Sequence, residues 1–306
     1  MKKIKLGLSN LEVPSLAVGC MRINGLDASA AENFVKTALD LGTNFFDHAD
    51  IYGNGECEEV FARAIGMNPQ IRERIFLQSK CGIVRSGMYN LSQEYIISSV
   101  DAILKRLQTD YLDVFLLHRP DALMDPAEIA ETFDKLEASG KVRNFGVSNH
   151  DPATISLLKK YVKQPLVTNQ LQLSITNASL ITQGLNTNTE GDIACDRDDG
   201  ALNFCRLNDI TVQAWSPFQY GFFEGTFIGS DKYPKINALL DELAEKYQVS
   251  VTTIALAWIL RHPANIMPVT GTTNVSRLAD CARATDIYLD RADWYAIYRA
   301  AGYRLP

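Results

Sequence analysis

The chain has 306 residues, of which 46% are hydrophobic and 22% charged, and its net charge is −6 at pH 7. This profile is typical of a folded globular protein, and the length fits one large α/β barrel. The negative charge argues against nucleic acid or an anionic membrane as a partner. No run of about 18 apolar residues is present to span a membrane, and no apolar segment follows the basic start at Met1–Lys5. We therefore expect no signal peptide and a cytoplasmic location.

The cysteines and histidines lack the spacing of a metal site. The six cysteines are scattered without a CxxC pair, and the four histidines form no HExxH or HxH motif. We therefore predict free thiols in a reducing cytosol and no metal centre.

Strand and helix patterns alternate through the first half of the chain, after an opening hairpin-like segment. Strands are predicted at 16–19, 44–47, 75–80 and 113–118, and helices at 28–41, 56–65, 92–107 and 125–139. Asp27 or Ser29 can cap the first of these helices, and Ser92 the third. Pro126 opens the fourth helix and Gly140 follows its end.

The second half repeats this alternation. Strands are predicted at 142–148, 167–171, 210–215 and 267–270, with helices from Asp151-Pro152, at 235–247, at 251–262 and from about 275. Two segments are predicted as long connections, the polar stretch 183–200 and the aromatic-rich stretch 218–233. The aromatic side chains of the second could face a substrate or pack onto the barrel itself.

The pattern predicts an α/β fold, a single (β/α)8 TIM barrel over residues 1–306 with an N-terminal hairpin and a C-terminal helix. The strands are almost continuously apolar, which indicates burial on both faces, as in a parallel sheet. Eight strand–helix units in this length favour a closed barrel over an open sheet. Functional residues of such a barrel lie at the carboxyl ends of its strands.

Four residues at the ends of successive predicted strands could share one pocket: Asp47, Tyr52, Lys80 and His118. A free phenol has a pKa of about 10, so Tyr52 donates a proton well only where its phenolate is stabilised. A Lys80 ammonium could do this, and Asp47 would keep that ammonium charged and oriented. His118 could donate a hydrogen bond to a substrate oxygen. Together these residues predict a proton-transfer site.

Each residue also has an ordinary structural interpretation. Asp47 could cap a strand end, Tyr52 could be a packing tyrosine, Lys80 a solvated strand end and His118 a core histidine. Lys80 could also act as a Schiff-base nucleophile, although pairing with Asp47 would keep its amine protonated and disfavours that. Four such residues on consecutive strands favour catalysis.

The order and context of these four residues resemble the aldo-keto reductase superfamily, and within it the bacterial oxidoreductase branch. The resemblance covers nearly the whole chain, through 44–53, 116–121, 140–150, 169–170, 214–217, 268–274 and Arg277. It implies a TIM barrel that binds a nicotinamide cofactor, usually NADPH, without a Rossmann domain. The chain has no GxGxxG motif, in agreement with this. The implied activity is reversible reduction of a small-molecule carbonyl compound, with Tyr52 as the acid.

The resemblance also implies a set of cofactor-binding residues. Ser148, Asn149 and Gln170 would hold the carboxamide, and Trp215 would stack on the nicotinamide next to Ser216. A second group, at the start of a helix, would grip the ribose phosphate: Gly271, Thr272, Thr273 and Arg277. Gly271 stands where the familiar form of the family has Lys, so one positive charge that would favour NADPH over NADH is missing. We nevertheless expect NADP(H) as the cofactor.

An alternative function is a nicotinamide-binding regulatory or redox-sensing subunit with little turnover. The sequence shows no evident obligate protein partner, and it leaves the substrate, the oligomeric state and the conformations of 183–200 and 218–233 open.

Overall fold

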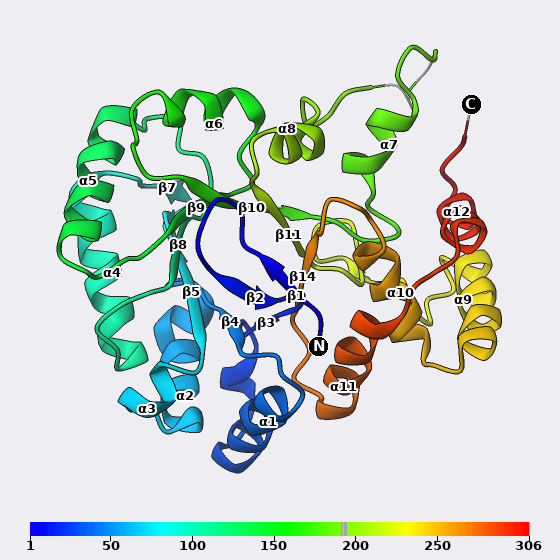
Figure 1. Ribbon diagram of the computed structural model, residues 1–306, viewed down its shortest axis with the longest axis horizontal. Helices are drawn as coiled ribbons and strands as arrows, with labels where there is room; N and C mark the ends of the chain where they lie inside the picture. Colours follow the sequence, from blue (N-terminus) through cyan, green and yellow to red (C-terminus); the bar gives the residue numbers. More distant parts are fainter. Residues whose placement is uncertain (191, 193–194, 306) are drawn as a thin grey trace.

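The computed structural model describes residues 1–190, 192 and 195–305. Within this part of the chain, eight parallel strands close into a barrel with helices around it (Figure 1). In chain order, which is also their order around the barrel, the strands are β3 (Ala17–Gly19), β4 (Phe45–Asp47), β5 (Phe76–Cys81), β8 (Val114–Leu117), β9 (Phe145–Ser148), β10 (Leu166–Gln172), β11 (Thr211–Trp215) and β14 (Met267–Thr270). The predicted TIM barrel is confirmed.

The helices of the outer layer follow the strands in the predicted alternation. They are α1 (Ala28–Asp40), α2 (Glu56–Ile65), α3 (Pro69–Arg72), α4 (Gln93–Leu107), α5 (Pro126–Ala138), α6 (Pro152–Lys159), α7 (Ser179–Leu185), α8 (Ala201–Leu207), α9 (Pro234–Tyr247), α10 (Val251–Leu260), α11 (Val275–Arg283) and α12 (Arg291–Ala300). Of the two candidate caps, Asp27 is the N-cap of α1 and accepts from the backbone N–H of Ala30. Ser92 caps α4 in the same way, through the N–H of Tyr95.

Several predicted boundaries were wrong. The strand predicted at 142–148 begins only at Phe145, because Val142 forms no more than an isolated bridge with Leu112. The helix predicted at 251–262 ends at Leu260. The stretch 218–233 is not a plain loop, since it contains the short hairpin β12 (Gln219–Tyr220) and β13 (Gly225–Thr226).

The polar stretch 183–200 includes the end of α7 and leads into α8, neither of which was predicted. Both helices have seven residues and no side-chain hydrogen bond at the N-cap, so they lack the periodicity and cap that mark a helix in sequence. Residues 191, 193 and 194 of this stretch lie outside the described residues.

The predicted N-terminal hairpin, β1 (Lys3–Lys5) with β2 (Glu12–Pro14), crosses the barrel end nearest the viewer in Figure 1. Its turn packs tightly, because Gly7 has a φ of +52° and its N–H donates to Thr211 Oγ1 at 2.8 Å. A Cβ at Gly7 would clash with the carbonyl oxygens of Val167 and Asp209. The hairpin therefore covers the amino ends of the strands, and the site lies at the opposite end.

The C-terminal helix α12 is fastened to α10 by a reciprocal pair of tryptophans. The indole N–H of Trp258 donates to the carbonyl of Trp294 at 3.1 Å, and that of Trp294 donates to the carbonyl of Trp258 at 3.0 Å. The two rings stack at a centroid distance of 5.0 Å. Both indole donors are thereby satisfied while the rings are buried.

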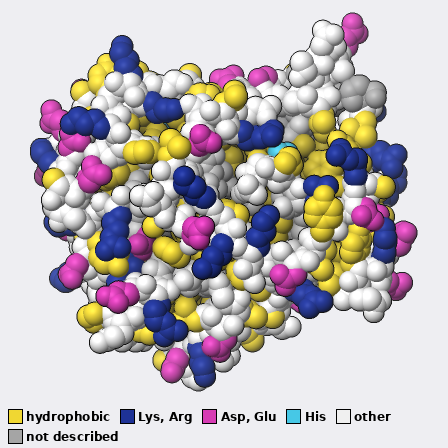
Figure 2. All heavy atoms as spheres, in the orientation of Figure 1, with side chains coloured by type: hydrophobic (Ala, Val, Ile, Leu, Met, Phe, Trp, Pro, Cys, Tyr) yellow, Lys and Arg dark blue, Asp and Glu magenta, His cyan; other side chains and the backbone are white. Residues whose placement is uncertain are grey.

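The face shown in Figure 2 carries basic and acidic side chains interspersed over the helices. None of the helices described is long and apolar enough to cross a membrane. In the described ranges, no group of three or more His, Cys, Asp or Glu side chains is placed to hold a metal ion.

Candidate active site

Strand register brings the four predicted catalytic residues to one end of the barrel. Asp47 ends β4, and its partner in the sheet is Gln78 of β5. Lys80 lies two residues further along β5, opposite Leu116 of β8, and His118 follows β8 directly. Tyr52 begins the short 3₁₀ turn η2 (Tyr52–Gly55) that follows β4.

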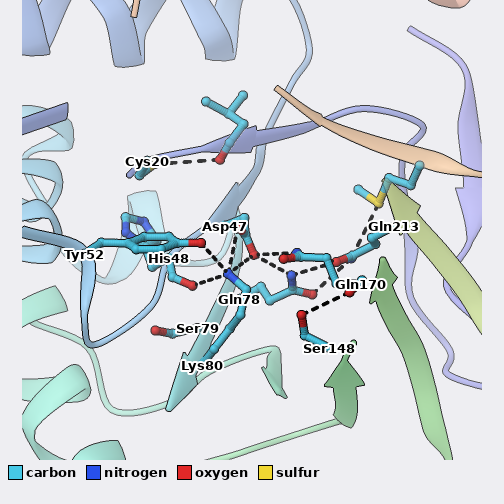
Figure 3. A network of polar contacts seen from close by, with 12 residues as sticks. Cys20, Asp47, His48, Tyr52, Gln78, Ser79, Lys80, Ser148, Gln170 and Gln213 are labelled. Carbon is cyan, nitrogen blue, oxygen red and sulfur yellow. Dashed lines mark hydrogen bonds and ion pairs between the residues drawn. The ribbon is translucent and has the colours of Figure 1, made fainter. Parts of the chain in front are cut away.

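The ammonium of Lys80 connects Asp47 with Tyr52 (Figure 3). Its Nζ atom lies 2.8 Å from each carboxylate oxygen of Asp47, 2.7 Å from the carbonyl oxygen of His48 and 3.3 Å from Tyr52 Oη. Lys80 is fully buried, so its charge is compensated by the Asp47 carboxylate rather than by water. The predicted order of contacts, Asp47 to Lys80 to Tyr52, is present in the structure.

The surroundings set the charge of each group. Burial acts to lower the pKa of Lys80, but Asp47 and Tyr52 raise it, and the pKa lies above its ordinary value. Burial raises the pKa of Tyr52, and Lys80 opposes that rise without cancelling it. Near neutral pH the site therefore holds a charged ammonium and a protonated phenol.

His118 is a neutral imidazole beside Tyr52. Burial, followed by the charges of Lys80 and Arg119, holds its pKa well below the usual range. The two rings meet edge to face with centroids 6.0 Å apart. His118 Nδ1 is buried and has no hydrogen-bond partner among the described residues.

Three buried glutamines form a hydrogen-bonded cluster beside the carboxylate of Asp47, and two of them, Gln78 and Gln213, were not predicted. Gln78 Nε2 donates to Asp47 Oδ1 at 2.6 Å, and Gln170 Nε2 donates to the same oxygen at 3.1 Å. Both also donate to Gln213 Oε1, at 2.8 and 3.0 Å. Gln213 Nε2 returns a hydrogen bond to Gln78 Oε1 at 3.0 Å. An alternating polar position inside a strand was the available sequence signal for these residues.

The turn that carries Tyr52 is built from left-handed backbone conformations. Gly53, Asn54 and Gly55 have φ angles of 55°, 60° and 90°. A Cβ at Gly55 would lie 2.6 Å from the Nε atom of Arg106, which donates to buried Glu58 at 2.7 Å. Glycine is therefore required at position 55, where the Arg106–Glu58 ion pair packs against the turn.

A cavity of about 770 Å³ opens above these residues. Tyr52 and His118 line one part of it, and Gly271, Thr272 and Arg277 line another. The other predicted cofactor-binding residues also line the cavity: Ser148, Asn149, Gln170, Trp215 and Ser216. All thirteen predicted site residues except Lys80, which lies buried behind Asp47 and Tyr52, thus border one cavity.

The predicted carboxamide-binding residues are tied to one another. Asn149 Nδ2 donates to Ser148 Oγ at 2.8 Å, and the Trp215 indole donates to Asn149 Oδ1 at 3.0 Å. Asn149 and Ser216 have φ angles of 58° and 52°, a strained conformation that is frequent at functional sites. Phe223 stacks on Trp215 with centroids 5.9 Å apart, so an aromatic ring already packs against this indole.

The other end of the cavity is cationic. Arg277 Nε donates to Thr272 Oγ1 at 3.2 Å, just inside α11, whose N-cap is Asn274. Arg22, which was not predicted, donates from Nη1 to the carbonyl of Gly271 at 3.2 Å. A Cβ at Gly271 would lie 2.7 Å from that same Nη1 atom. Arg22 therefore occupies the space that a side chain at 271 would enter.

The comparisons with known proteins agree with this geometry. A model described as the aldo/keto reductase family matches residues 15–301. The chain belongs to the aldo-keto reductase family. This aldo-keto reductase is 37% identical to the uncharacterized oxidoreductase YcsN of Bacillus subtilis (strain 168), over 100% of both chains.

Two further relatives support the same assignment. A 6-dehydroglucose reductase of Novosphingobium aromaticivorans is 34% identical over 99% of this chain and 96% of its own. The crystal structure of a thermostable aldo-keto reductase in complex with the inhibitor epalrestat superimposes with a TM-score of 0.78 at 27% identity, covering 98% of this chain and 100% of that one. The predicted family and fold are confirmed, and the chain is an oxidoreductase of the aldo-keto reductase type.

Proposed function

We propose that this aldo-keto reductase uses NADPH to reduce aldehydes or ketones reversibly to alcohols, with Tyr52 as the general acid. The observation that carries the proposal is the position of the Lys80 ammonium. It lies 2.8 Å from Asp47 and 3.3 Å from Tyr52 Oη, directly behind a cavity large enough for a substrate. This arrangement supports a role for the Tyr52 hydroxyl as the proton donor at the cavity wall.

The residues along the cavity suit a nicotinamide dinucleotide. Arg22, Arg277 and the amino end of α11 supply positive charge and backbone N–H groups for a phosphate. At the other end, Gln170 Oε1 accepts no hydrogen bond from a described donor, so it can receive one from a carboxamide. Two arginines at the phosphate end favour NADPH, whose additional 2′-phosphate would pair with them.

When bound, NADPH supplies a hydride to the carbonyl carbon of the substrate. Tyr52 Oη donates its proton to the carbonyl oxygen, and the nearby Lys80 ammonium stabilises the phenolate that forms. Asp47 holds that ammonium charged, while Gln78 and Gln170 donate hydrogen bonds to its carboxylate. His118 is neutral, and with no acceptor at Nδ1 its proton is placed on Nε2, from which it donates to the same carbonyl oxygen.

The direct test follows a label from cofactor to product. Purified enzyme is incubated with a panel of aldehydes and ketones and with NADPH that carries deuterium as the transferable hydride at C4 of the nicotinamide. The alcohols that form are analysed by mass spectrometry. Deuterium on the former carbonyl carbon supports the proposal. Tight NADPH binding without labelled alcohol from any carbonyl would favour the alternative function, a regulatory or redox-sensing subunit. Borohydride trapping of substrate on Lys80 would instead support Schiff-base chemistry.

A further inference from the structure

Arg119 lines the cavity and has no ion-pair or hydrogen-bond partner for its side chain among the described residues. It follows His118 directly at the end of β8, and its side chain is half-buried. Its guanidinium carbon lies 5.8 Å from the ring centre of Trp215 and 5.9 Å from that of Phe222. Across the described part of the chain, no carboxylate lies within ion-pair distance of Arg119, and no protein acceptor receives its N–H groups.

The groups that do lie near Arg119 cannot compensate its charge. Burial lowers the pKa of Arg119, and the neighbouring titratable groups are the phenols of Tyr52 and Tyr89. Two imidazoles, His118 and His150, also lie near it, and both are neutral. Asp47 is the one carboxylate among the described residues that line the cavity, and Lys80 already neutralises it. A partly desolvated cation with no counterion is unfavourable, so a bound anion would stabilise it.

This cation lies apart from those at the phosphate end. Arg22 and Arg277 contact Gly271 and Thr272, next to α11. Arg119 instead follows His118, the residue that faces the reacting carbonyl, and it lies near the exposed aromatic side chain of Phe222. The cavity thus has one cationic region for the cofactor and a second one beside the catalytic residues.

We propose that Arg119 binds a carboxylate of the substrate, so that the enzyme prefers oxo acids over neutral carbonyl compounds. This inference rests on the proposed function and narrows its substrate class. The planar guanidinium matches a carboxylate through two parallel hydrogen bonds. Trp215 and Phe222 provide apolar surface for the carbon chain between the carboxylate and the carbonyl.

The test compares succinic semialdehyde with butanal, which has the same number of carbons and no carboxylate. Wild-type enzyme should show the higher kcat/KM for succinic semialdehyde. Arg119→Met, which keeps length but removes charge, should lower that value roughly 10- to 100-fold and change the value for butanal less than about threefold. Arg119→Lys should retain part of the preference, and Arg63→Met, an exposed arginine on α2, serves as the control.

Other outcomes of this comparison overturn the inference. Equal losses on both substrates would make Arg119 a structural support for Trp215 and Phe222. A higher Kd for NADPH in Arg119→Met would place Arg119 in the cofactor site. A wild-type preference for a neutral sugar aldehyde such as glyceraldehyde over succinic semialdehyde would exclude a carboxylate partner.

A binding measurement separates this inference from the proposed function. Titration of 4-hydroxybutyrate or 1-butanol into the enzyme with NADPH requires no turnover. Binding of 4-hydroxybutyrate by the wild type but not by Arg119→Met supports the carboxylate site even if no carbonyl is reduced. Turnover of carbonyls without any preference for the carboxylate would leave the proposed function intact and overturn the role of Arg119.

Discussion

Lys80 Nζ lies 3.3 Å from Tyr52 Oη, within reach of a hydrogen bond that strengthens as the phenol loses its proton. Because Lys80 is fully buried and paired with Asp47, its ammonium is fixed at this position rather than shared with solvent. The relation between the two residues gives Tyr52 its proposed ability to act as an acid.

Replacement of Lys80 should affect both activity and stability. Lys80→Met removes the stabilising charge, so kcat should fall at least 100-fold at neutral pH. It also leaves Asp47 buried and unpaired, which should lower the free energy of unfolding by about 3 to 5 kcal/mol. In the double variant with Asp47→Asn, denaturant unfolding should recover part of that loss while activity stays low. Equal instability of the single and double variants would contradict this explanation.

The cluster of Gln78, Gln170 and Gln213 should contribute to the stability of the folded protein. Gln213→Leu deprives Gln78 and Gln170 of partners in a fully buried site, so the free energy of unfolding should fall by about 1 to 3 kcal/mol. Gln70→Leu, on the exposed face of α3, should change it by less than about 0.5 kcal/mol. Denaturant titration measures both, and an unchanged midpoint for Gln213→Leu would exclude this role.

Arg22 should contribute to the selection of NADPH. Arg22→Ala should raise the Kd for NADPH about tenfold and leave that for NADH nearly unchanged, because only NADPH carries the 2′-phosphate. Removing Arg22 also opens the space beside Gly271, so adding Gly271→Lys should restore NADPH binding. Fluorescence titration measures each Kd. Equal weakening of both cofactors would assign Arg22 to another part of the dinucleotide.

Asp50 should give the protein a pH-dependent stability. Burial, and after it the charge of Glu58, raise the pKa of Asp50 to about 7 from its ordinary 3.8. Between these two values the folded state keeps a proton that the unfolded state has released, so this contribution to stability is full below about pH 4 and is lost as the pH rises to about 7.

Asp50→Asn removes that titration. The variant should therefore gain stability relative to the wild type as the pH rises from 4 to 8, with a slope of at most about 1.4 kcal/mol per pH unit. Comparing the two proteins cancels the opposite slope that buried His150, with its pKa lowered by burial to about 4, contributes to both. A constant difference across this range would show that Asp50 ionises normally.

The barrel and the positions of the proposed catalytic residues were predictable because their signals are local. Apolar strands with polar ends mark Asp47, Lys80 and His118, and the turn at Gly53–Gly55 marks Tyr52. The roles of Arg22 and Gln213 were not predicted, because they depend on contacts with Gly271 and Gln78, residues far away in the sequence. The polar position of Gln213 within its strand indicates an inward-facing side chain but not its partner. The short helices α7 and α8 were missed for a different reason, since neither has a side-chain N-cap or enough turns to show a period.

The central claim is that Tyr52 donates the proton, and the rate of NADPH oxidation by Tyr52→Phe tests it most directly. The substitution removes one oxygen atom from a residue that lies at the cavity wall. We expect kcat for carbonyl reduction to fall by about 10² to 10⁴ while the Kd for NADPH remains within twofold of the wild-type value. Turnover by Tyr52→Phe at a rate close to that of the wild type, with NADPH bound equally well, would contradict the mechanism.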